Sequence, residues 1–174
     1  MVGKQQLRSV RSQDKDAFNT IIEDYYDDIY RFCLYMTGHE ADSYDITQDV
    51  FLRFIRYAGS GRYKNLKGYL ITIARNLCMD YFTHRKEDAA KSEMMSQVLK
   101  EGPQMTEVEN KLFLLKLLDH LSCEQKEVVI LRIYEDMKFK DIAEMTGINV
   151  STIKSRYQMG IANMKRYMEE GGYG

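Results

Sequence analysis

Polar and basic side chains gather on one side of a helix that the sequence predicts from Val150 onward. Asn149 is a good N-cap residue for this helix, and Gly147 suits a preceding turn that needs a positive φ. The outward-facing residues are Ser151, Thr152, Lys154, Ser155, Arg156 and Gln158. Such side chains suit phosphates and base edges, and a helix can present them to the major groove of DNA. The alternative interpretation is a plain helical hairpin with a solvated polar face.

Apolar residues around this turn have the spacing of two packed helices. Ile142 and Ala143 lie on the inner face of the first helix, and Ile148 is expected to pack inward at the turn. Along the second helix, apolar residues recur every three or four positions, at Val150, Ile153, Tyr157, Ile161 and Met164. This period gives one buried stripe. The segment 138–164 is therefore predicted to be a helix-turn-helix.

A second group of polar residues lies on the outer face of a helix predicted from Glu40 to Tyr57. The inward-facing residues of this helix are Ile46, Val50, Phe54 and Tyr57. The outer face carries Asp42, Asp45, Asp49, Arg53 and Arg56, with Gln48 beside them. One interpretation is a solvated helix face. The other is a docking surface for a basic partner, which complementary charge would guide into register.

Basic side chains and aromatic side chains are combined in the loop 58–65 and in the helix predicted from Leu66 to Lys86. Basic residues can follow a nucleic-acid backbone, and aromatic rings accept unstacked bases. The combination comprises Tyr57, Arg62, Tyr63, Lys64, Arg75, Tyr81 and Phe82. The predicted buried stripe of the helix is Tyr69, Leu70, Ile73, Leu77 and Tyr81. The opposite side carries Thr72, Arg75, Asn76, Met79, Asp80 and Thr83.

These elements predict an all-α fold of two small helical domains joined by a flexible linker. A helix over 14–37 joins the two helices above in a three-helix core. Its apolar stripe is Phe18, Ile22, Tyr25, Ile29, Phe32 and Met36. We expect the first domain at 12–86, the linker at 87–106 and the second domain at 107–168. In the second domain, Ser122 and Gln125 have the spacing of a capping box.

Charge is sorted into blocks along the 174 residues, although the net charge is only −1. Residues 12–49 hold ten acids and two bases, and residues 87–110 hold six acids and two bases. Residues 62–86 hold six bases and one acid, and residues 138–166 hold six bases and two acids. This distribution is typical of a protein with two nucleic-acid contacts and a separate protein contact.

Composition and spacing argue against several classes of protein. No apolar run approaches the roughly 20 residues that a membrane helix needs, and the N-terminal segment lacks the apolar core of a signal peptide. Three distant cysteines indicate reduced thiols and a cytoplasmic location. His120 and Cys123 are three residues apart, but no second pair completes a zinc site. No phosphate loop or catalytic constellation is present, so we expect no enzyme activity, metal or cofactor.

Over residues 17–167, the chain resembles an extracytoplasmic-function (ECF) sigma factor of bacterial RNA polymerase. Residues 45–52 (DITQDVFL) are similar to the segment of that family that binds core polymerase. Residues 69–77 (YLITIARNL), followed by Asp80, look like its promoter-melting helix. Residues 142–156 match its region 4 helix-turn-helix. The motifs come in the family's order and at the family's spacings.

The resemblance implies three sets of site residues. The set expected to contact core RNA polymerase is Asp42, Asp45, Gln48, Asp49, Leu52 and Arg53. The set expected to take the minus-ten promoter DNA is Arg62, Tyr63, Lys64, Arg75, Asn76, Met79, Asp80 and Thr83. The polar face of the helix from Val150 is expected to read the minus-thirty-five element. A further expected partner is an anti-sigma factor, either soluble or membrane-bound, with no membrane insertion of this chain.

Some residues depart from the family's pattern. The prolines that the family often has before Tyr69 and after Leu121 are absent, and residues 157–160 (YQMG) replace a strongly basic stretch. The acidic linker either is a tether or enters the polymerase channel. Two alternatives for the whole protein are a decoy that sequesters an anti-sigma factor and a helix-turn-helix repressor without polymerase contact.

Overall fold

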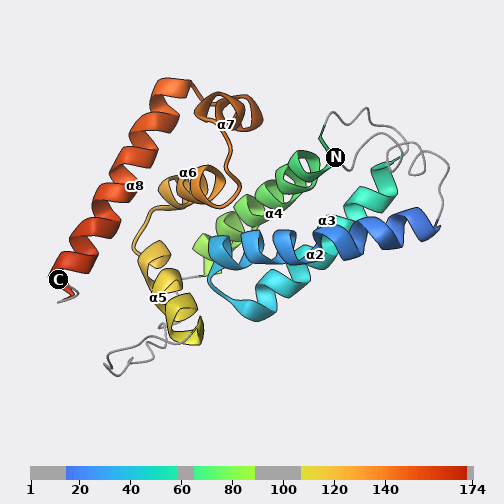
Figure 1. The fold of residues 1–174 in the computed structure, drawn as a ribbon, viewed down its shortest axis with the longest axis horizontal. Helices are drawn as coiled ribbons and strands as arrows, with labels where there is room; N and C mark the ends of the chain where they lie inside the picture. The colour runs from blue at the N-terminus through green and yellow to red at the C-terminus, as the bar shows by residue number, and fades with distance from the viewer. Residues whose placement is uncertain (1–14, 59–64, 89–106, 172–174) are drawn as a thin grey trace. The chain divides into compact units, whose positions relative to one another are not determined.

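The computed structural model describes residues 15–58, 65–88 and 107–171, and the side chains of 86–88 are excluded. Every regular element in these ranges is helical, which confirms the all-α fold (Figure 1). The chain divides into two compact units, one up to Tyr81 and the other from Phe82. The predicted linker lies almost entirely outside the described residues. The functional assignment of the domain ranges stays a prediction.

Three helices build the first unit: α2 (Lys15–Thr37), α3 (Glu40–Tyr57) and the larger part of α4 (Leu66–Asp88), which continues past the unit boundary at Tyr81. α2 and α3 form an extensively packed antiparallel pair (Figure 1). α4 is tied to α2 by an ion pair of 2.9 Å between Lys67 Nζ and Asp28 Oδ2. Rings of Phe54 and Tyr69 meet edge to face at 6.4 Å between α3 and α4. The three helices therefore share one core, as their amphipathic patterns predict.

The turn from α2 to α3 is fixed by backbone and hydroxyl groups. Gly38 follows the last residue of α2 with φ +74°, a left-handed conformation that commonly ends helices. The buried hydroxyls of Thr37 and Ser43 are 2.7 Å apart, and Thr47 Oγ1 donates to the Ser43 carbonyl at 2.7 Å. Buried polar groups need such partners. These hydroxyls pair within the turn, and the amphipathic pattern did not predict their burial.

The core of the first unit corrects several predictions. Tyr57 is 54% exposed rather than inward-facing, because it ends α3 and Ala58 fills the adjacent core position. On α2, Ile21 is fully buried, and the predicted Ile22 and Tyr25 are only half-buried. The α4 residues Tyr69, Ile73 and Tyr81 are half-buried too. Buried positions of α4 are Leu66, Leu70, Ile71, Ala74, Leu77 and Cys78.

Four helices build the second unit: α5 (Glu107–Asp119), α6 (Cys123–Ile133), α7 (Phe139–Thr146) and α8 (Val150–Glu170). α6 contacts α7 and α8, and Val128 to Leu131 are buried all round the helix. The predicted capping box is confirmed: Gln125 N–H donates to Ser122 Oγ at 3.2 Å, and Ser122 N–H donates to Gln125 Oε1. Ile133, the last residue of α6, is 48% exposed.

Cys33 and Cys78 are fully buried in the core of the first unit, and all three cysteines are free thiols. Over the described ranges, no group of three or more potential metal-ligating residues comes together. Among the described helices, none combines the length and the apolar character that crossing a bilayer requires.

Candidate nucleic-acid interface

The turn between α7 and α8 has the geometry that the sequence predicts. Gly147 ends α7 with φ +71°, a left-handed conformation that glycine adopts at little cost. The Asn149 side chain accepts from the Ser151 N–H at 2.8 Å and from the Ser151 hydroxyl at 2.9 Å. Ile142 is fully buried and Ala143 nearly so. The Asn149 cap fixes the start of α8 at Val150, and this start determines where the first polar side chains of α8 lie.

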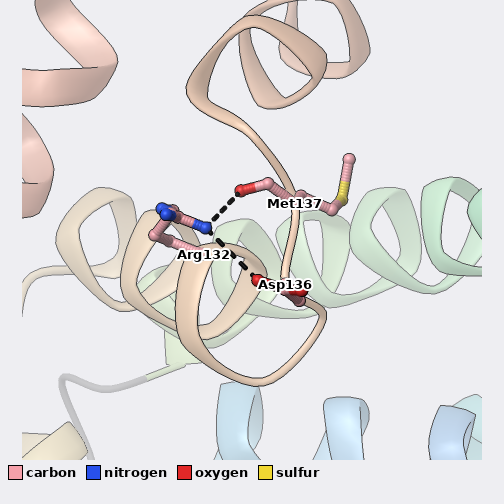
Figure 2. A network of polar contacts seen from close by, with 3 residues as sticks. All are labelled: Arg132, Asp136 and Met137. Atoms are coloured by element: carbon pink, nitrogen blue, oxygen red, sulfur yellow. Dashed lines mark hydrogen bonds and ion pairs between the residues drawn. The ribbon is translucent and has the colours of Figure 1, made fainter.

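The approach to α7 is fixed by Arg132, in the last turn of α6 (Figure 2). Its Nη1 lies 3.5 Å from Asp136 Oδ1 and donates to the Met137 carbonyl at 3.3 Å. The same guanidinium lies over the Phe139 ring, 5.3 Å from its centroid. Asp136 has φ +49°, an unusual backbone conformation for a residue other than glycine. These contacts hold the connection that determines where α7 begins.

The inner face of α8 is anchored to α6 and α7. Ile153 is fully buried, and Tyr157 packs edge to face on Phe139 with ring centroids 5.3 Å apart. Gly160 is buried where α8 crosses α6, and a Cβ there would lie 2.8 Å from Val129 Cγ2. A methyl group at that distance forces a shift, so glycine permits this close approach. The anchored inner face fixes which side of α8 is turned to solvent.

The polar residues predicted on α8 lie on this solvent side. Arg156 is half-buried, and the others of the set are exposed: Ser151, Thr152, Lys154, Ser155 and Gln158. The surface combines hydroxyl, amide and cationic groups near a helix N-terminus. Such groups suit hydrogen bonds to phosphates and base edges.

α3 presents the second predicted surface in the first unit. Its exposed members are Asp45, Gln48, Asp49, Leu52 and Arg53. Leu52 is 61% exposed, and Tyr44 on the same helix is 50% exposed, so apolar groups accompany the charges. Asp42 differs, because it is half-buried and its Oδ2 accepts a hydrogen bond of 2.7 Å from the Tyr81 hydroxyl of α4. The structure therefore separates Asp42 from the rest of the predicted set.

α4 carries the third predicted surface. Asn76, Asp80 and Thr83 are exposed, and Arg75 and Met79 are half-buried. Arg75 Nη1 donates to Asn76 Oδ1 at 3.2 Å, which orients the Asn76 amide. The predicted loop residues of this set, Arg62, Tyr63 and Lys64, lie outside the described residues. The described part of the surface offers amide donors and carboxylate acceptors one helical turn apart.

Two families of known proteins match this chain. Sigma-70 region 2 matches residues 21–87, and Sigma-70 region 4 matches residues 112–164. The chain belongs to the ECF sigma factors. The region 2 match begins in the first compact unit of this sigma factor and runs past its boundary at Tyr81, and the region 4 match lies within the second. The first match includes α3 and nearly all of α4, and the other includes the helix-turn-helix.

Relatives of this sigma factor span most or all of its length. It is 27% identical to the ECF RNA polymerase sigma factor BldN of Streptomyces coelicolor, covering 94% of this chain and 65% of that protein. It is also 27% identical to the ECF RNA polymerase sigma factor SigW of Bacillus subtilis, covering 98% of each. The sigma factor RpoE of Bartonella quintana, solved with the anti-sigma factor NepR, has the same fold. The TM-score is 0.72, with 22% identity over 87% of this chain and 96% of that chain.

Sequence reasoning missed three contacts that position the surfaces of this sigma factor. The Tyr81–Asp42 hydrogen bond joins residues 39 positions apart, so no local pattern contains it. Arg132 lies at the end of an apolar run, and its partners lie in an irregular turn. Gly160 differs: a glycine inside a helical pattern is itself a signal of close packing, and it could have been found.

Proposed function

We propose that this sigma factor binds core RNA polymerase and directs promoter-specific initiation of transcription. The observation that carries the proposal is that one chain presents the exposed acidic face of α3 and the exposed polar face of α8 on separate units. A helix-turn-helix repressor needs only the second surface. The names of its relatives, which are RNA polymerase sigma factors, support the same function.

The exposed face of α3 is proposed to dock on a basic surface of the polymerase. Asp45 and Asp49 are one helical turn apart and supply negative charge, which guides encounter and sets the register. The neighbouring Leu52 and Tyr44 supply apolar area, which contributes most of the affinity in such interfaces.

The outer face of α4 is proposed to take the unpaired strand of the minus-ten element. A flipped base costs a few kcal/mol, and a pocket must offset this cost by stacking and by hydrogen bonds to the base edge. Asn76 and Asp80 are exposed on one face of α4 and offer both donors and acceptors for such an edge. The polar face of α8 is proposed to read the minus-thirty-five element in the major groove.

An anti-sigma factor is part of the proposal as a second partner. The sigma factor RpoE, which has this fold, was solved with such a protein. The decoy alternative would keep this partner and lack any activity with polymerase. It makes no use of the exposed groups on α4, so initiation is the function that accounts for more of the surface.

The charge-reversed double variant Asp45→Lys, Asp49→Lys tests core binding. Both side chains are exposed, so the variant should fold normally and lose most of its co-purification with core polymerase. A matched control is Glu23→Lys, Asp27→Lys, which makes the same charge change at exposed sites on α2. Equal co-purification of wild type and the α3 variant would show that α3 is not the docking face. No co-purification of the wild type would contradict the proposed function.

A further inference from the structure

Residues 157–160 follow the polar N-terminal part of α8, and the structure divides them by the direction that they face. Tyr157 packs on Phe139, and Gly160 is buried against α6. Gln158 and Met159 remain exposed. The outward positions of this stretch therefore carry an amide and a thioether instead of cations. Neither group is charged, so neither can form an ion pair with a phosphate.

Met159 lies on the same exposed face as the predicted base-reading residues. It is 55% exposed and follows Ser155 by one helical turn. The Ser155 hydroxyl lies 4.0 Å from the Met159 sulfur, so the thioether reaches back toward the N-terminus of α8. Helical side chains commonly lean in this direction. The tip of Met159 thus lies beside a polar side chain that the proposed function places in the groove.

The chemistry of Met159 selects one group on DNA. All four bases present hydrogen-bonding atoms in the major groove. Thymine is the one base of the four that also presents a methyl group there, at C5. A flexible, polarisable thioether adapts to such an apolar group. We propose that Met159 contacts a thymine C5-methyl group in the upstream promoter element and makes this thymine a specificity determinant. The inference rests on the proposed function, namely that α8 enters the major groove.

Replacement of thymine by deoxyuridine tests the contact, because it removes only the methyl group. The full chain with core polymerase first selects duplexes from a pool with a randomised upstream element. Each thymine of a selected duplex is then replaced singly, and the affinity is measured. The wild type should lose about fourfold at one position, the effect of one buried methyl group. Met159→Ala should bind the thymine and uracil forms of that position equally.

Two further variants separate the contact from a general effect on α8. Met159→Leu keeps an apolar side chain and should keep the preference for thymine. Glu169→Ala, at an exposed site in the last turn of α8, should leave the uracil sensitivity as in the wild type. Wild-type tolerance of uracil at every position would overturn the inference and leave the proposed function intact. Unchanged uracil sensitivity in Met159→Ala would overturn it too. Failure to select any DNA would contradict the proposed function itself, and the inference with it.

Discussion

At the scale of single residues, the polar face of α8 contains two cations in different surroundings. Lys154 is exposed, and Arg156 is half-buried against the unit. A lysine contacts a phosphate as a point charge, whereas an arginine can contact a base edge through two parallel hydrogen bonds. The exposed position suits a phosphate contact, and the partly packed position gives a guanidinium the fixed orientation that base reading needs.

We therefore expect different losses from Lys154→Ala and Arg156→Ala. Loss of a phosphate contact should reduce the salt slope of promoter binding by about 1, with little dependence on sequence. Loss of a base contact should cost about 1–3 kcal/mol and relax specificity at one position. Binding is measured over a range of salt concentrations, with Lys15→Ala on α2 as the control for charge. Unchanged affinity and salt slope in both variants would exclude α8 as the reading helix.

Gly160 yields a prediction about stability. Alanine normally stabilises a helix interior by about 1 kcal/mol relative to glycine. Here its Cβ would lie 2.8 Å from Val129 Cγ2 in a packed interior, so Gly160→Ala should instead destabilise the second unit by about 1–3 kcal/mol. Thermal unfolding measures the effect. Gly68→Ala is the control, because its Cβ would meet only the side chain of exposed Asn65, at 3.2 Å.

A second variant, Val129→Ala, tests whether the clash with Val129 causes the destabilisation expected for Gly160→Ala. If the clash causes the loss, combining the two substitutions should cost less than the sum of their separate effects, because Val129→Ala removes the opposing methyl group. Additive effects, or a stabilised Gly160→Ala, would show that α6 and α8 adjust to the methyl group without strain.

At the scale of elements, the Tyr81–Asp42 hydrogen bond links the helix proposed to bind polymerase with the helix proposed to open DNA. The hydroxyl donates to a carboxylate at 2.7 Å, and both residues are half-buried. Hydrogen bonds to charged groups contribute about 1.5–3 kcal/mol, and partial exposure places this one toward the lower end. Asp42 thus acts within the unit, and Asp45 and Asp49 remain the acids available for docking.

Tyr81→Phe should therefore destabilise the first unit by about 1–2 kcal/mol through loss of this hydrogen bond. Denaturant unfolding measures the change, and hydrogen exchange locates it along α3 and α4. In a double-mutant cycle with Asp42→Ala, the effects should be strongly non-additive, because either substitution removes the same bond. Full additivity would mean that the bond contributes nothing to stability.

Much of each element was predictable because helical periodicity is a local property. The predicted bounds of α3, Glu40 and Tyr57, match the structure, and the caps at Ser122 and Asn149 form as their residue types indicate. The wrong prediction for Tyr57 has a physical reason: Tyr57 is the last residue of α3, and Ala58 after it takes the buried position, which a helical stripe does not reveal. Contacts such as Tyr81–Asp42 depend on how helices cross, which no periodicity contains.

At the scale of the whole molecule, the candidate surfaces lie on two units with separate cores. The sequence blocks of alternating charge predicted two nucleic-acid contacts and a separate protein contact, and the family models match residues 21–87 and 112–164. Each surface alone is open to a simpler interpretation, either a solvated helix face or an ordinary helix-turn-helix. Opening of DNA in company with polymerase is the activity that a decoy and a repressor lack.

Permanganate footprinting of single-stranded thymines tests this central claim most directly. Wild-type protein with core polymerase should expose reactive thymines at the minus-ten element of a cognate promoter. Asn76→Ala, Asp80→Ala should reduce this reactivity sharply at equal promoter occupancy, because both side chains are exposed on α4 and act after the duplex is engaged. A premelted template should partly rescue the variant, since the cost of unpairing is already met. Reactivity as strong in the variant as in the wild type would contradict the proposed role of α4, and no reactivity with the wild type at any promoter of its own genome would contradict the account as a whole.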